Sequence, residues 1–150
     1  MTRVLGFVLV LSYGTLGPAW ATHHRGSLTV HIESLERAEG SVCVALWTGE
    51  GRGFPSELRL AADMRCVAVH DHVASVTFGD LVSGRYAAMA FHDRNDNRRL
   101  DRNLLGIPRE HTGIAFQDLQ RGHRSLPSFR DAAFDVPAGT RTIAIHLHGH

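Results

Sequence analysis

Lysine is absent from this chain of 150 residues, so all 16 of its basic residues are arginine. They face 15 aspartate and glutamate residues, and removal of an N-terminal segment that contains Arg3 would leave a balance of zero. Without a stripe of like charge, the chain is a poor match for nucleic acid or an anionic membrane surface as its main partner. Eleven histidines make its charge sensitive to acidification.

Long apolar runs are also missing. The run Val4–Leu11 is shorter than the ~20 residues that a transmembrane helix needs. With Arg3 before it and Ala19-Trp20-Ala21 after it, segment 1–21 has the pattern of a signal peptide with a small-x-small cleavage site. No cysteine lies near that site, so we expect no lipid anchor. The prediction is a single domain, 22–150, that is periplasmic or secreted after cleavage near Ala21 and has no transmembrane segment.

Cysteine is nearly absent as well, since only Cys43 and Cys66 are present. In an oxidising compartment an isolated pair usually forms a disulfide, and both residues lie in strand-like runs that can bring them together. Two buried free thiols are the alternative. A catalytic dithiol is not expected, because the pair lacks the Cys-x-x-Cys spacing.

The dominant hydrophobic period along the chain is two, which is typical of half-buried strands. Glycine and aspartate turns separate the runs, and segment 106–130 is a long loop in which Gly113–Leu119 could form a helical turn. The pattern predicts an all-β fold, a single antiparallel β-sandwich of about seven strands. Its expected strands include Ser27–Leu35, Ser41–Thr48, Arg65–His70, Val73–Phe78, Gly84–His92 and Thr142–His148.

One segment carries metal-binding chemistry. Oxygen-bearing side chains alternate after the strand 84–92, in the ligand order of a calcium loop, which surrounds a hard cation with oxygen. The expected Ca²⁺ ligands are the side chains of Asp93, Asn95, Asn97 and Asp101 and the backbone carbonyl of Arg99. The alternative is an Asx-rich turn in which these side chains hydrogen-bond their own backbone.

The loop departs from an EF-hand in three ways. Arg98 stands at offset 6, where that turn needs glycine, and Leu104 stands at offset 12 in place of the bidentate glutamate. A strand precedes the loop instead of a helix. The EF-hand is therefore excluded, and a calcium loop of similar spacing on a β-scaffold remains.

Several motifs together resemble a family of uncharacterised bacterial secreted proteins, domain of unknown function 2141. The resemblance covers roughly Ser27 to Leu147 and implies an exported β-sandwich, transthyretin-like or carboxypeptidase-regulatory-like, without an assigned activity. The family's loop usually reads Asn-Gly-Asn-Gly-Lys-Leu-Asp, and its first four positions here are Asn95, Asp96, Asn97 and Arg98. The motifs that carry the resemblance are Gly53-Phe54-Pro55, Arg85–Asp93, Leu100-Asp101, Leu105–Pro108 and Pro127–Phe134.

The expected function is that of a non-enzymatic binding or interaction module whose partner is an unknown protein or small molecule. No Gly-x-Ser-x-Gly elbow, His-Glu-x-x-His helix or phosphate loop occurs, so a hydrolase is a distant alternative. A periplasmic copper or zinc binder is another alternative, because histidines alternate in two places and follow one another at the expected new N-terminus. Those histidines are His70 and His72, then His146, His148 and His150, and His23 and His24.

Overall fold

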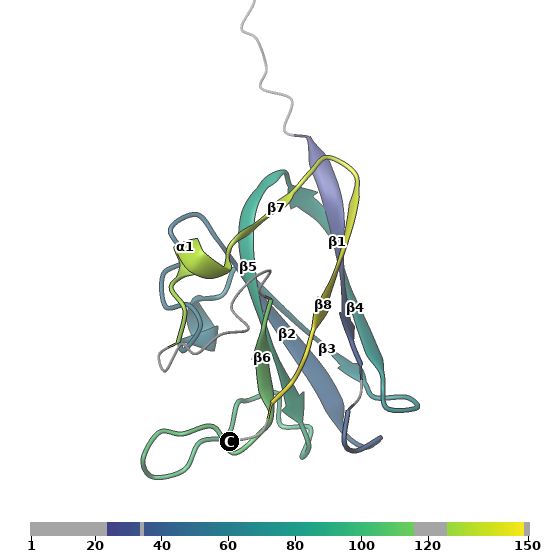
Figure 1. The fold of residues 1–150 in the computed structure, drawn as a ribbon, viewed down its shortest axis with the longest axis vertical. Helices are drawn as coiled ribbons and strands as arrows, with labels where there is room; N and C mark the ends of the chain where they lie inside the picture. The colour runs from purple at the N-terminus through teal and green to yellow at the C-terminus, as the bar shows by residue number, and fades with distance from the viewer. Residues whose placement is uncertain (1–23, 34, 116–125, 149–150) are drawn as a thin grey trace, which may run out of the picture.

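The computed structural model describes residues 24–33, 35–115 and 126–148, and its strands form two layers (Figure 1). One sheet has the strand order β4-β1-β8, and the other has the order β3-β2-β5-β6, with β7 also paired to β5. The predicted all-β sandwich is therefore confirmed. The elements are β1 Arg25–Ile32, β2 Ser41–Thr48, η1 Leu58–Leu60, β3 Asp63–Ala68, β4 Ala74–Val82, β5 Gly84–Asp93, β6 Thr112–Ile114, α1 Phe129–Ala132, β7 Phe134–Val136 and β8 Thr140–Ile145.

The main core lies between the two sheets, and the alternation in the sequence accounts for it. Side chains two residues apart on a strand point to the same face, so each strand contributes one apolar row. The rows of β1, β2 and β4 are fully or almost fully buried. They consist of Leu28, Val30 and Ile32, then Val42, Val44 and Leu46, and finally Val76 and Phe78.

The five-stranded sheet also buries its outer face. Cys43, Trp47 and Phe91 form a second cluster there, and the rings of Phe54 and Phe129 lie over it. Strands β2 and β5 are consequently buried on both faces, which explains why their sequences are almost continuously apolar. The far end of β5 is therefore a firm support for the loop that follows it.

The two cysteines occupy directly opposite positions on β2 and β3 and form the predicted disulfide, with their Cα atoms 4.0 Å apart. This finding replaces the alternative of two free thiols. Disulfides persist in oxidising compartments, which is compatible with a location outside the cytoplasm. Among the described residues, no helix is long and apolar enough to cross a membrane. The predicted signal peptide, residues 1–21, lies outside the described residues.

The arrangement differs from the predicted one in two respects. Strands β1 and β8 pair in parallel, from Ser27 beside Thr140 to Ile32 beside Ile145, so the sandwich is not wholly antiparallel. β7 pairs with β5 in one sheet and β8 pairs with β1 in the other, so the chain crosses between the sheets just before this parallel pair. The expected loop 106–130 contains β6 where a helical turn was predicted to begin; residues 116–119 of that turn lie outside the described residues.

Candidate metal-binding loop

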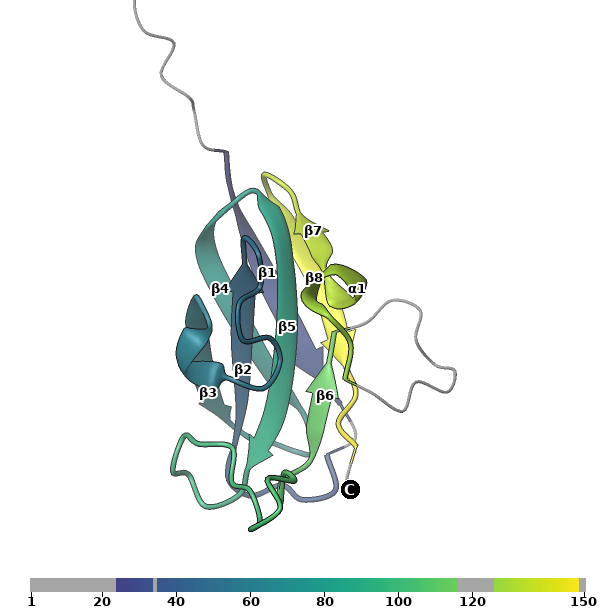
Figure 2. The ribbon, with the colours of Figure 1, turned by 90° about the vertical axis from the view of Figure 1, so that its left-hand side faces the viewer.

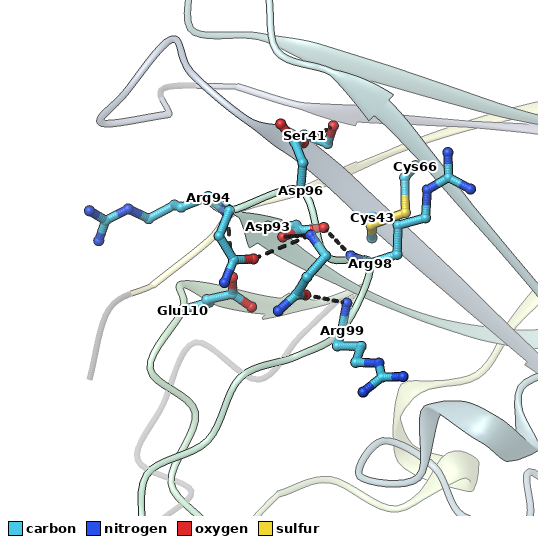
Figure 3. Close-up of a disulfide and its surroundings, with 11 residues drawn as sticks. Ser41, Cys43, Cys66, Asp93, Arg94, Asp96, Arg98, Arg99 and Glu110 are labelled. Carbon is cyan, nitrogen blue, oxygen red and sulfur yellow. Dashed lines mark hydrogen bonds between the residues drawn. A yellow bond between two sulfur atoms is a disulfide. The ribbon is translucent and has the colours of Figure 1, made fainter.

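Strand β5 delivers Asp93 to the base of the loop that follows it (Figure 3). The side chain is fully buried, yet it lies among donors: Oδ2 accepts a hydrogen bond from the Arg98 N–H at 2.6 Å, and Oδ1 accepts one from the Asn97 N–H at 3.1 Å. A buried carboxylate needs such partners, because an unpaired one is costly to remove from water. Asp93 thus fixes the turn from the inside.

The side chains of Asn95 and Asn97 converge on Asp101. Their Nδ2 groups donate to the two Asp101 carboxylate oxygens at 2.8 and 3.1 Å. Asn95 Oδ1 accepts a hydrogen bond from the Asn97 N–H at 3.3 Å, and Asn97 Oδ1 accepts one from the Arg99 N–H at 2.8 Å. The loop therefore contains the Asx turns of the alternative interpretation. It joins the side chains of Asn95, Asn97 and Asp101, whereas Asp93 reaches the loop through backbone N–H groups.

The backbone of the loop takes the left-handed conformation at two positions, with φ of 56° at Asp96 and 57° at Arg98. Arg98 is the sixth residue from Asp93, where calcium loops of this spacing need such a turn. Arg98 therefore takes the backbone conformation that glycine adopts at this position of such loops. Asp96 is held in place by the Ser41 hydroxyl, which donates to its carboxylate at 2.6 Å.

Arg99, the predicted backbone ligand, follows this turn at an exposed position. Its N–H contributes to the Asx turn of Asn97, and its side chain points away from the loop (Figure 3). Leu100 is buried in the cluster on the outer face of the five-stranded sheet. One apolar side chain thereby anchors the loop between Arg99 and Asp101.

Glu110 is a carboxylate that the sequence analysis missed. It is buried two residues before β6, and its oxygens accept hydrogen bonds from the N–H groups of Arg94 at 3.3 Å and Asp101 at 3.2 Å. It therefore joins the two ends of the loop. Burial raises the pKa of Glu110 above its ordinary value of 4.5, and the charges of Asp93 and Asp101 act in the same direction, while the two hydrogen bonds oppose the rise.

The donor set suits a hard cation, since it consists of carboxylate and amide oxygens on a tight turn. Within the described residues there is no group of three or more His, Cys, Asp or Glu side chains arranged to hold a metal ion. The asparagine nitrogens already occupy the Asp101 oxygens, so a cation has to displace them. The arrangement therefore fits a weak calcium site better than a tight one, and it fits a self-bonded turn equally well.

The model of one protein family matches residues 30–144, and its description is "uncharacterized protein conserved in bacteria", domain of unknown function 2141. The chain belongs to this family. The match confirms the resemblance drawn from the motifs, and it supplies no activity. No curated protein and no solved structure matches the chain. The transthyretin-like detail of the fold therefore stays a prediction.

The histidines are arranged differently from the predicted alternation at His70 and His72. Asp71 and His72 have φ of 50° and 62° and form a tight turn, across which His70 and Val73 exchange backbone hydrogen bonds. The prediction that His70 and His72 share a strand face is wrong, because the chain reverses there. His72 Nδ1 lies 2.6 Å from the Leu35 carbonyl oxygen.

The C-terminal histidines follow β8. His146 and His148 are both exposed, and His148 pairs through its backbone with Thr112 at the start of β6. His24 is exposed as well, whereas His23 and His150 lie outside the described residues. A transition-metal site built from these histidines stays a prediction.

Proposed function

We propose that this member of the family is an exported, non-enzymatic binding module whose Asp93–Asp101 loop is ordered by calcium. The observation that carries the proposal is the convergence of Asp93, Asp101 and Glu110 around one loop that keeps the left-handed turn at Arg98. The charges of Asp93 and Asp101 disfavour the charged form of Glu110, and a divalent cation would relieve that repulsion. When bound, calcium would supply positive charge and a fixed geometry to the loop.

Export is supported by two independent features. The N-terminal segment 1–21 has a signal-peptide pattern. The Cys43–Cys66 disulfide is of a kind that cytosolic thiol reductants remove. Calcium is also abundant outside the cytoplasm, where modules with dissociation constants of about 10⁻⁴ to 10⁻³ M are in use. The transthyretin-like arrangement of the strands belongs to the same proposal.

Thermal unfolding of the oxidised protein, in EDTA and in calcium from about 0.1 to about 10 mM, tests the proposal. At a tenfold excess over the dissociation constant, a ligand that binds only the folded state adds about 1.4 kcal/mol to the free energy of unfolding. For a domain of this size the melting temperature should rise by about 4–6 °C. A saturable rise in calcium, with a smaller one in magnesium, is the expected result.

Two aspartate variants make the test specific. Asp93→Asn keeps the shape and one acceptor oxygen but removes a charge from the loop, so the calcium-dependent rise should disappear. Asp80→Asn removes an exposed carboxylate in β4, away from the loop, and should leave the rise unchanged. The comparison uses the difference between calcium and EDTA for each protein, because Asp93→Asn also weakens the apo fold. No rise in the wild type, or an equal rise in Asp93→Asn, overturns the proposal.

A further inference from the structure

The segment between Asp101 and Arg109 forms a small hairpin that projects from the end of the sandwich. Arg109 N–H donates to the Asp101 carbonyl at 2.8 Å, and Asn103 N–H donates to the Ile107 carbonyl at 2.9 Å. At its tip, Leu104 and Leu105 have relative exposures of 106% and 83%. These neighbouring leucines form an exposed apolar tip, and apolar patches rimmed by polar residues mark interaction sites.

The tip is ordered although its side chains are exposed. The Asn103 side-chain oxygen accepts hydrogen bonds from the Leu105 N–H at 2.9 Å and the Ile107 N–H at 3.0 Å. The Arg102 guanidinium donates to the Gly106 carbonyl at 2.8 Å. Backbone groups that are satisfied internally can enter an apolar medium without the cost of losing water. The hydrogen bonds of the hairpin already hold the backbone of both leucines in place, so little conformational entropy is lost when the leucines are buried.

Basic side chains are frequent in the segment that carries this tip. Segment 94–109 contains five arginines and two acidic residues, so about a third of the 16 arginines of the chain lie in one loop. All five are exposed, and none forms an ion pair among the described residues; they are Arg94, Arg98, Arg99, Arg102 and Arg109. Figure 3 shows Arg94, Arg98 and Arg99 pointing away from the loop in different directions. The balanced charge of the whole chain conceals this local excess.

A hollow of about 340 Å³ separates two of these arginines. Arg94 and Arg109 line it together with Glu39, Asn95, Asp101 and Glu110. It has room for a phosphate group, and the arginines can bind phosphate oxygens. The three carboxylates in its lining oppose such binding until a cation reduces their negative charge. The metal-binding loop and the apolar tip thus face the same end of the molecule, opposite the start of β1 (Figure 2).

We propose that this end of the sandwich docks on an anionic phospholipid surface, with Leu104 and Leu105 inserted among the acyl chains and the arginines against the phosphates. A convex apolar tip requires a complementary pocket on a protein partner, whereas a fluid bilayer admits it without one. Arginines near an anionic surface each strengthen attraction by about fivefold. The inference rests on the proposed function for its calcium dependence, since calcium in the loop reduces the opposing charge at the hollow.

Co-sedimentation with lipid vesicles tests this inference. The protein is purified in the form that results from processing in the producing cell. Its N-terminus is then determined, because an uncleaved apolar leader would bind vesicles by itself. Vesicles of phosphatidylcholine alone are compared with vesicles that contain about one third phosphatidylglycerol. The expected result is binding to the anionic vesicles, stronger in calcium than in EDTA, and weakened by high salt because exposed charges are screened.

Matched variants locate the contact. Leu104→Ser with Leu105→Ser should lower the vesicle partition coefficient by at least tenfold, because burial of two leucines is lost. Val82→Ser removes an apolar side chain that is also exposed, at the opposite end of the sandwich, and should have no effect. Arg99→Glu with Arg109→Glu should weaken binding to anionic vesicles by more than tenfold. When a Leu104→Trp variant binds vesicles, its tryptophan fluorescence should shift to shorter wavelength and be quenched by brominated lipid.

The outcomes separate this inference from the calcium proposal. Absence of binding to anionic vesicles in calcium overturns the membrane inference, even where calcium raises the melting temperature. Equal vesicle binding in EDTA and calcium, with no change in melting temperature, supports the membrane inference and overturns the calcium proposal. Vesicle binding that the leucine variant leaves intact overturns the inference. Concentration-dependent dimerisation that the same variant abolishes assigns the tip to a second copy and also overturns it.

Discussion

Asp96 and Arg98 stand two residues apart in the loop after β5, and both adopt a left-handed backbone with φ of 56° and 57°. Residues with a Cβ atom pay about 1–2 kcal/mol for this conformation, which glycine adopts freely. These are also the two positions at which the family's usual loop sequence has glycine. The loop therefore keeps a conformation that its own sequence makes less stable.

Arg98→Gly should consequently raise the free energy of unfolding by about 0.5–1 kcal/mol, since the relief of strain exceeds the added flexibility of the unfolded chain. Asp96→Gly should gain less, because it loses the hydrogen bond from Ser41. Urea unfolding in EDTA measures both changes. Arg99→Gly is the control, at a position without positive φ, and it should destabilise. Destabilisation by Arg98→Gly would contradict the interpretation.

Reduction of the Cys43–Cys66 disulfide should destabilise the domain by about 3 kcal/mol, because it frees a loop of roughly 24 residues in the unfolded chain. Urea unfolding with and without dithiothreitol measures the loss. The Cys43→Ala, Cys66→Ala double variant is the control. Its stability without dithiothreitol should already be that of the reduced wild type, and dithiothreitol should not change it. An unchanged unfolding midpoint after complete reduction of the wild type would show that the disulfide adds little.

The sequence predicted the strands that can be identified from their own hydrophobic pattern. Apolar runs bounded by turn residues identified β2 and β5 to within a residue, because both faces of these strands are buried. The hydrophobic pattern could not reveal β6 and β7, since three residues are too few for a period of two and both strands depend on β5 for their partner. The parallel pairing of β1 with β8 was hidden for a related reason: it depends on where the chain crosses between the sheets.

The same distinction applies to the candidate site. Asp93, Asn95, Asn97 and Asp101 were predictable because their spacing is local. Glu110 was not, because it lies 17 residues beyond Asp93 in a segment without a clear period, and only the pairing of β6 with β5 brings it to the loop. The five exposed arginines of segment 94–109 are close together in the sequence, but the balanced charge of the whole chain concealed them.

Glu110 should make stability depend on pH in a particular direction. Its pKa is raised in the folded state, so between the ordinary value of 4.5 and the raised value the folded protein binds more protons than the unfolded protein. The contribution of Glu110 to stability is thus most favourable at low pH and declines as pH rises through that window. Unfolding free energies in EDTA between about pH 4 and pH 7.5 measure this decline.

A glutamine variant isolates Glu110 from the other carboxylates. The stability of the wild type minus that of Glu110→Gln should fall as pH rises, whatever the absolute loss caused by the altered hydrogen bonds to Arg94 and Asp101. The variant itself retains the pH dependence of every other group. A difference that stays constant, or that increases with pH, would show that burial does not raise the pKa of Glu110.

Gly113 lies where the strand that supports the metal-binding loop approaches the second sheet. It lies in β6, and a Cβ atom at this position would overlap the backbone carbonyl oxygen of His146 and approach the Ile145 Cγ2 to 2.7 Å. Because the nearest obstacle is backbone, it cannot simply rotate away. Gly113→Ala should therefore destabilise the domain by about 1–3 kcal/mol, the usual cost of overpacking. Since Glu110 lies only three residues earlier, the same variant should also weaken any calcium-dependent rise in melting temperature.

Gly79→Ala in β4 provides the control for Gly113→Ala. A Cβ atom there would meet nothing within 4 Å, so the substitution should be neutral or slightly stabilising. Urea unfolding of both variants in EDTA gives the stability difference, and melting in EDTA and in calcium gives the effect on the loop. If Gly113→Ala proved as stable as Gly79→Ala, the close approach of β6 to the end of β8 would be refuted. β6 would then support Glu110 through its pairing with β5 alone.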